Sequence, residues 1–187
     1  VLNIAMRLTV IVAVVVAMLA TVNAVTKDRI AENNAASRNA ACGELIEGAE
    51  FESFDISALN VDYSEITNFD KNSVAVWRGT KNGELAGWCV EVTGKGYSSD
   101  GIGLIVGISA DGQTVLGVRC VSSSETSGIG SKVVSDNYLL KFADRTSSEV
   151  ASVDAVSGAT RTSRGVKDGI KAAVACVKAI TEQEGGR

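Results

Sequence analysis

The feature that most constrains this chain is an uncharged segment near its N-terminus. No Asp, Glu, Lys or Arg occurs between Arg7 and Lys27, and residues 8–26 are mostly Val, Ala, Leu and Ile. A helix of roughly 20 apolar residues is long enough to cross the hydrocarbon core of a bilayer. The rest of the chain is therefore expected to lie on one side of a membrane.

Two interpretations of this segment are open. As a signal peptide, residues 8–20 are its apolar core and Val22-Asn23-Ala24 is the cleavage site. As a retained anchor, the helix continues through "KDRIAENNAASRNA", which has no helix breaker before Gly43. The anchor is favoured because the apolar run does not stop at the small residues. We predict a transmembrane anchor at 1–26, a helical stalk at 27–43 and an extracytoplasmic domain at 44–187.

Composition excludes several classes of function. The 187 residues include no histidine, which rules out Ser-His-Asp and Cys-His catalysis and histidine-ligated metals. The 18 basic and 22 acidic residues form no basic stripe interleaved with aromatics, so nucleic acid is not an expected partner. No metal site and no catalytic side chain is predicted. Any chemistry is expected to belong to a bound cofactor.

The four cysteines, Cys42, Cys89, Cys120 and Cys176, are widely spaced and form no C-x-x-C motif. Iron–sulfur and zinc sites are therefore not expected. Two interpretations remain. Cys89 and Cys120 both lie in strand-like segments and are the more plausible disulfide pair, or all four cysteines are small buried apolar residues.

The middle of the chain predicts antiparallel hairpins. "NSVAVWRG" and "ELAGWCVEVTG" are separated by an Asn82-Gly83 turn signal, and "GIGLIVGISA" and "QTVLGVRCVS" flank Asp111-Gly112. A helix is expected near Ser131, a short one at "DNYLLKFADR" and a long amphipathic one at the C-terminus. The fold class is α+β, a twisted, mainly antiparallel sheet with packed helices. Candidate core residues of the sheet are Val74, Val76, Val90, Val92, Ile105, Val115 and Val118.

The segment before the last helix, "SGATRTSR", is suited to an anion. Gly158 and Ala159 leave room for a bulky group to approach Thr160, and Thr162 or Ser163 can cap the helix. A phosphate near Thr160 would face unpaired amides, the positive end of the helix dipole, and Arg161 or Arg164. The same residues also fit an ordinary loop before a capped helix.

A second segment, "ETSGIG" at 125–130, places two glycines one residue apart after a strand. Glycines allow the backbone to approach a flat ligand closely, although the same pattern fits a plain strand-to-helix turn.

Together the two segments resemble a known family. "DAVSGATRTSRGV" resembles the covalent flavin-attachment motif, in which an Asp precedes Ser-Gly-Ala-Thr by three residues. "ETSGIGSK" is similar to the family's Glu-Thr-Pro-Gly-Leu-Gly segment, with Ser127 in place of the proline and Ile129 in place of the leucine. The chain thus resembles FMN-binding domain proteins, in particular the G subunit of the Rnf electron-transport complex. The C subunit of the sodium-pumping NADH:quinone oxidoreductase is a relative of that protein.

The resemblance implies a cofactor and its site. Thr160 would carry FMN through a phosphoester, installed by a flavin transferase that uses FAD, and Asp154 would belong to the recognition motif. The other residues expected to contact the cofactor are Ser157, Gly158, Ala159, Thr162, Ser163, Tyr97, Glu125, Thr126, Gly128, Ile129 and Gly130.

The resemblance also implies a function. The chain would be an electron-relay subunit of a membrane-bound, ion-translocating ferredoxin:NAD oxidoreductase, not catalytic alone, with the other iron–sulfur and flavin subunits and membrane lipid as partners. The flavin domain would lie outside the cytoplasmic membrane. Alternatives are a stand-alone anchored flavoprotein reductase, a subunit of a sodium-pumping quinone reductase, or a non-catalytic exported module with an accidental Ser-Gly-Ala-Thr.

Overall fold

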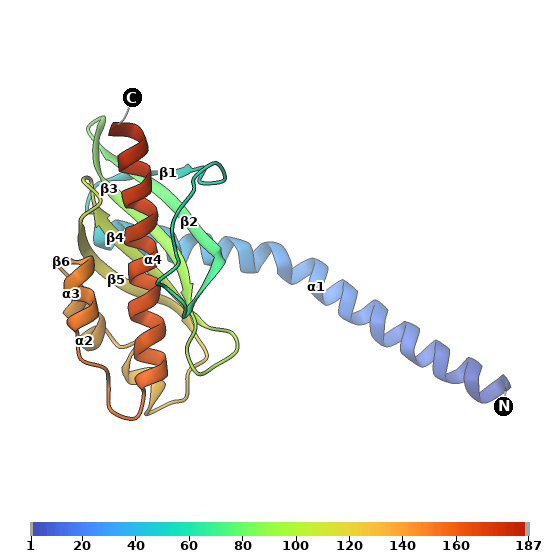
Figure 1. Cartoon of the computed structure of the whole chain (residues 1–187). Coiled ribbons are helices and arrows are strands. Elements are labelled where there is room, and N and C mark those ends of the chain that lie inside the picture. The colour runs from blue at the N-terminus through green and yellow to red at the C-terminus, as the bar shows by residue number, and fades with distance from the viewer. Residues whose placement is uncertain (1, 186–187) are drawn as a thin grey trace. The chain divides into compact units, whose positions relative to one another are not determined.

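The computed structural model describes residues 2–185 and contains one long N-terminal helix followed by an α+β domain (Figure 1). Contacts divide the chain into two compact units, the first ending at Ser37 and the second beginning at Arg38. The fold class predicted from the sequence is confirmed. The predicted domain boundaries at 26/27 and 43/44 stay predictions.

The first unit consists of helix α1 (Leu2–Leu45) up to Ser37. Its large apolar side chains from Ile4 to Ile30 are 46–73% exposed. By length and composition this helix can cross a membrane, although a signal sequence would pass the same test. Such an apolar surface is unfavourable in water, so it needs an apolar environment.

The second unit is built on a six-stranded sheet in which every strand is antiparallel to its neighbour. The strands follow chain order: β1 (Glu50–Phe54), β2 (Phe69–Lys81), β3 (Glu84–Gly94), β4 (Ile102–Ser109), β5 (Thr114–Ser123) and β6 (Arg145–Thr146). Both predicted hairpins are present. Asn82 and Gly83 have positive φ angles of 55° and 84°, as the tight turn between β2 and β3 requires.

Short helices and one long helix complete the domain. After β5 come a 3₁₀ turn η1 (Gly130–Lys132), α2 (Asp136–Leu139), η2 (Leu140–Phe142) and α3 (Ser147–Ser152). The last helix, α4 (Thr160–Gly185), crosses one face of the sheet (Figure 1). Its predicted apolar stripe is buried: Val166, Ile170, Val174, Val177 and Ile180.

The other face of the sheet is covered by the last turns of α1. Cys42 and Ile46 are buried there, and Leu45 packs where Gly107 of β4 faces Gly117 of β5. The central strand β4 is consequently buried on both faces from Ile102 to Ile108. Ile105 therefore packs against α1, whereas the other buried core candidates face α4. Val74 is only half-buried.

Of the two interpretations of the cysteines, the Cys89–Cys120 disulfide does not fit the strand order. Cys89 lies on β3 and Cys120 on β5, with β4 between them. Neighbouring strands are about 4.8 Å apart, so the two Cα atoms are separated by more than the roughly 7 Å that a disulfide tolerates. All four cysteines are free thiols in the structure.

Helix α4 packs closely against the β3–β4 loop at Gly165. A Cβ atom there would lie 2.5 Å from the Lys95 carbonyl oxygen. This contact fixes the start of α4 against the loop between β3 and β4, because backbone cannot move aside as a flexible side chain can.

We predict that Gly165→Ala destabilises the domain by about 1–3 kcal/mol, because the clash outweighs the gain in helix propensity. The matched control is Gly43→Ala in α1, where nothing lies within 4 Å of the added methyl group. That change should stabilise by about 0.5–1 kcal/mol. Urea unfolding of both variants measures the difference, and a neutral Gly165→Ala would contradict the contact.

Candidate functional site

Three loops converge at the N-terminal end of α4 and form one pocket, called here the Glu125 pocket. Its volume is about 330 Å³, near the lower end of the roughly 300–1,000 Å³ usual for ligand sites. The lining residues come from the β3–β4 loop, the β5–η1 loop and the start of α4: Tyr97, Glu125, Thr126, Ile129, Gly130, Gly158, Ala159, Arg161 and Thr162.

The Glu125 carboxylate connects all three segments. Its Oε1 accepts a hydrogen bond from the Ser98 amide at 2.9 Å. Its Oε2 accepts one from the Thr162 hydroxyl at 2.6 Å. Thr162 is 2% exposed, so its hydroxyl depends on this partner. A single half-buried carboxylate thus sets the distance between the two loops and the helix.

Two glycines make room for this carboxylate. A Cβ atom at Gly96 or at Gly130 would collide with the Glu125 carboxyl oxygens. The "GIG" pattern therefore has a physical reason at Gly130. Gly128 serves differently: its φ of 79° is in the left-handed region, and its amide donates to the Ser131 hydroxyl at 2.9 Å.

The mouth of the pocket is partly aromatic and apolar. Tyr97 is 75% exposed and Ile129 is 51% exposed, both at the rim. Flat apolar surface beside a few polar groups is the usual lining of a site for a planar ring system. Arg161 adds the positive charge that a phosphorylated ligand requires.

Helix α4 begins at Thr160, so the predicted N-cap at Thr162 or Ser163 is wrong. Ala159 precedes the first helical residue and has no side-chain oxygen to cap with. Among residues 2–185, the amides of Thr160, Arg161 and Thr162 have no hydrogen-bond acceptor, whereas the Ser163 amide donates to the Ala159 carbonyl at 2.9 Å. The helix therefore presents free N–H groups and the positive end of its dipole at this point.

Thr160 is exposed and lies outside the Glu125 pocket. It lines a second hollow of about 290 Å³, called here the Thr160 hollow, with Ala151, Ala155, Arg164, Lys167, Asp168 and Lys171. Lys167 already donates to the Val153 carbonyl at 3.0 Å, and Asp168 accepts from the Asn68 side chain at 2.7 Å. Arg164 is exposed one turn after Thr160 and is available to an anion there.

The remaining predicted residues support the loop before α4. The Ser163 hydroxyl accepts from the Val156 amide and donates to the Ala159 carbonyl, each at 3.0 Å. Gly158 has a φ of 79°, and Ser157 and Asp154 are exposed. The Asp154 carbonyl accepts from the Tyr138 hydroxyl at 3.1 Å. Burial raises the pKa of Tyr138, so this hydroxyl remains a donor at neutral pH.

Eight of the predicted cofactor residues therefore meet in one pocket, whereas Thr160, Asp154, Ser157, Ser163 and Gly128 are not among the residues that line it. Arg161, expected only near the phosphate, lines the pocket as well. The sequence does not predict a role for Ser98. Its hydrogen bond to Glu125 comes from the backbone amide, which does not depend on the type of side chain.

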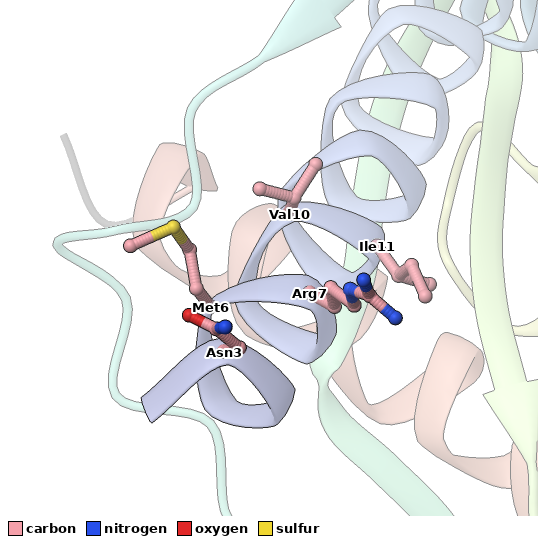
Figure 2. A pocket seen from close by; sticks show the side chains of 5 residues that line it. All are labelled: Asn3, Met6, Arg7, Val10 and Ile11. Atoms are coloured by element: carbon pink, nitrogen blue, oxygen red, sulfur yellow. The ribbon is translucent and has the colours of Figure 1, made fainter. Parts of the chain in front are cut away.

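A further hollow occurs on α1 beside Arg7 (Figure 2). Side chains of one helical stretch form all of it: Asn3, Met6, Arg7, Val10 and Ile11. A single helix encloses nothing, so this surface is no ligand site.

The family model of the FMN-binding domain matches residues 96–175, a range that contains every residue of the Glu125 pocket. The G subunit of the Na(+)-translocating ferredoxin:NAD(+) oxidoreductase complex of Acetobacterium woodii is 32% identical, over 88% of this chain and 86% of the relative. The G subunit of the ion-translocating oxidoreductase complex of Methanosarcina acetivorans is 30% identical, over 94% and 92%.

The chain belongs to the family of G subunits of ion-translocating oxidoreductase complexes, and the resemblance inferred from the two motifs is confirmed. The crystal structure of Shewanella oneidensis NqrC has the same fold, with a TM-score of 0.52 and 24% identity over 72% of this chain and 75% of that one.

We predict that Glu125→Ala destabilises the domain by about 1–3 kcal/mol, because it leaves the buried Thr162 hydroxyl and the Ser98 amide without their acceptor. Hydrogen exchange at the Ser98 amide should accelerate, while exchange in β4 follows only the global loss of stability. Glu182→Ala, on an exposed position of α4, is the control and should change stability by less than about 0.5 kcal/mol. Unchanged protection at Ser98 would show that the carboxylate does not join the loops.

Proposed function

We propose that this chain is an electron-relay flavoprotein subunit of an Rnf-type ion-translocating ferredoxin:NAD oxidoreductase, with FMN joined to Thr160 through a phosphoester. The single observation that carries the proposal is the position of Thr160. Thr160 is the first residue of the long helix α4, whose first amides are free. It is exposed and lines the Thr160 hollow with Arg164, while its chain neighbours Ala159 and Arg161 line the Glu125 pocket.

The residues of this chain fit the parts of FMN. Gly96 and Gly130 admit the Glu125 carboxylate to the pocket, and Tyr97 and Ile129 offer aromatic and apolar surface for the ring system. Arg161 and Arg164, which follow Thr160 in the first turns of α4, would neutralise the phosphate together with the α4 amides. Bound FMN supplies one- and two-electron redox chemistry.

Attachment needs an unhindered hydroxyl. In the proposed maturation step, the Thr160 Oγ forms a bond to the flavin-side phosphorus of FAD and the pyrophosphate bond breaks. AMP leaves with the electron pair and takes up the hydroxyl proton. A flavin transferase would catalyse this step. Gly158 and Ala159 have no bulky side chains that would block its approach, and Thr160 itself is exposed.

The proposal makes the subunit a carrier, not a catalyst by itself. The chain has no histidine, and the Glu125 carboxylate is already engaged with Ser98 and Thr162. Relatives of this chain are named as subunits of ion-translocating oxidoreductase complexes, which supports other subunits as electron donor and acceptor. The exposed apolar side chains of α1 support membrane lipid as its surroundings.

We predict that Thr160→Val abolishes covalent flavin, because the valine has no oxygen to form the phosphoester. Thr160→Ser is the matched control and should keep it. Both variants should unfold within about 0.5 kcal/mol of the parent chain, since Thr160 is exposed. Flavin fluorescence on a denaturing gel measures attachment after expression with the flavin transferase. A fluorescent band in the valine variant would assign the attachment to another residue.

We further predict that the domain after α1 lies on the extracytoplasmic side. Protease added to intact spheroplasts should digest it, whereas the same protease added to inverted membrane vesicles should leave it whole until detergent is added. A cytoplasmic subunit of the same complex gives the opposite pattern and serves as the control. Protection in spheroplasts would contradict the proposed orientation.

A further inference from the structure

Two of the four cysteines meet on the sheet face that α1 covers. Cys42 lies one turn before the end of α1, and Cys89 lies in the middle of β3. They are 1% and 0% exposed and belong to one small cluster with Ala41 and Ile105. The interaction between the two thiols lowers the pKa of Cys42 and raises the pKa of Cys89.

The contact is held in place from both sides. Leu45, one turn beyond Cys42, packs where glycines face each other on β4 and β5. Arg38, one turn before Cys42, stacks over the Trp77 ring at 4.3 Å and lies 3.9 Å from the Glu91 carboxylate. Trp77 is the register partner of Cys89 on β2, so these contacts keep the two thiols adjacent.

We propose that Cys42 and Cys89 form a disulfide in the mature protein, which fastens the end of α1 to the central sheet. The proposal rests on the extracytoplasmic location of the domain, because disulfides form and persist in oxidising compartments. The oxidant is a thiol–disulfide oxidoreductase of that compartment.

The exchange is balanced in atoms and electrons. The thiolate of one cysteine attacks the disulfide of the oxidant and forms a mixed disulfide. The second cysteine, as its thiolate, then attacks the sulfur of the first, the Cys42–Cys89 bond forms, and the oxidant leaves as a dithiol. Two electrons and two protons pass from the cysteine pair to the oxidant. Because both thiols are buried in the folded domain, the exchange belongs to folding, before the last turns of α1 close over β3.

The other two cysteines are placed to remain thiols. Cys120 donates to the Ser122 carbonyl at 3.4 Å, and Cys176 on α4 interacts with Tyr63. Both side chains belong to the hydrophobic cluster that faces α4, whereas Cys42 and Cys89 belong to the cluster under α1, so the pairing is selective.

The test maps disulfides in the full-length protein from native membranes, quenched in acid, alkylated with N-ethylmaleimide under denaturing conditions and digested without reductant. The expected result is one linked peptide pair containing Cys42 and Cys89, with Cys120 and Cys176 alkylated. Reduction should lower the unfolding temperature by roughly 5–15 °C. The double variant Cys42→Ala/Cys89→Ala should lose this sensitivity, and Cys120→Ala/Cys176→Ala should keep it.

A second arm separates this proposal from the proposed function. The reduced, purified chain is refolded with oxidised glutathione, which needs no particular membrane side, and should give the same single pair. Four alkylated cysteines in native protein, or a different pair in the refolded protein, would overturn the disulfide. The peptide containing Thr160 is read in the same digest, so absence of flavin there tells against the attachment site alone.

Discussion

The position of the first turn of α4 depends on the Glu125 carboxylate. It accepts hydrogen bonds from the β3–β4 loop through Ser98 and from α4 through Thr162, while its own backbone belongs to the β5–η1 loop. The close contact of Gly165 with the Lys95 carbonyl sets the height of the same helix above the sheet. Together, the Glu125 hydrogen bonds and the Gly165 contact hold the N-terminal end of α4 beside the Glu125 pocket.

The first turn of α4 has residues of two kinds, some that bond to the neighbouring loops and some that are exposed to a ligand. Thr162 and Ser163 are buried and hold the loops together, whereas Thr160 and Arg161 are exposed and free to meet a ligand. The uncapped amides of α4 gain no partner within the described chain. An anion attached at Thr160 would supply one, so the proposed cofactor would also complete the helix end.

Much of the fold could be predicted from sequence because period-two alternation, an Asn-Gly turn and a period-3.6 stripe are local signals. Local signals fail where tertiary contacts decide. Nothing in the β4 sequence shows that a second helix covers its other face, so the alternation cannot assign Ile105 to the cluster under α1. The N-cap prediction fails for a similar reason: Thr162 lies within α4, and its hydroxyl donates to Glu125, 37 residues earlier, instead of capping the helix. The cysteine pairing required the strand order, which spacing alone does not give.

The most direct test of the proposed attachment is mass-spectrometric mapping of the protein isolated from its native host, where its own maturation enzyme is present. We predict that the peptide ending at Arg161 carries the mass of one FMN less one water, and that fragmentation places it on Thr160. The same peptide found only in unmodified form, or the added mass on Thr162 or Ser163, would contradict attachment at Thr160.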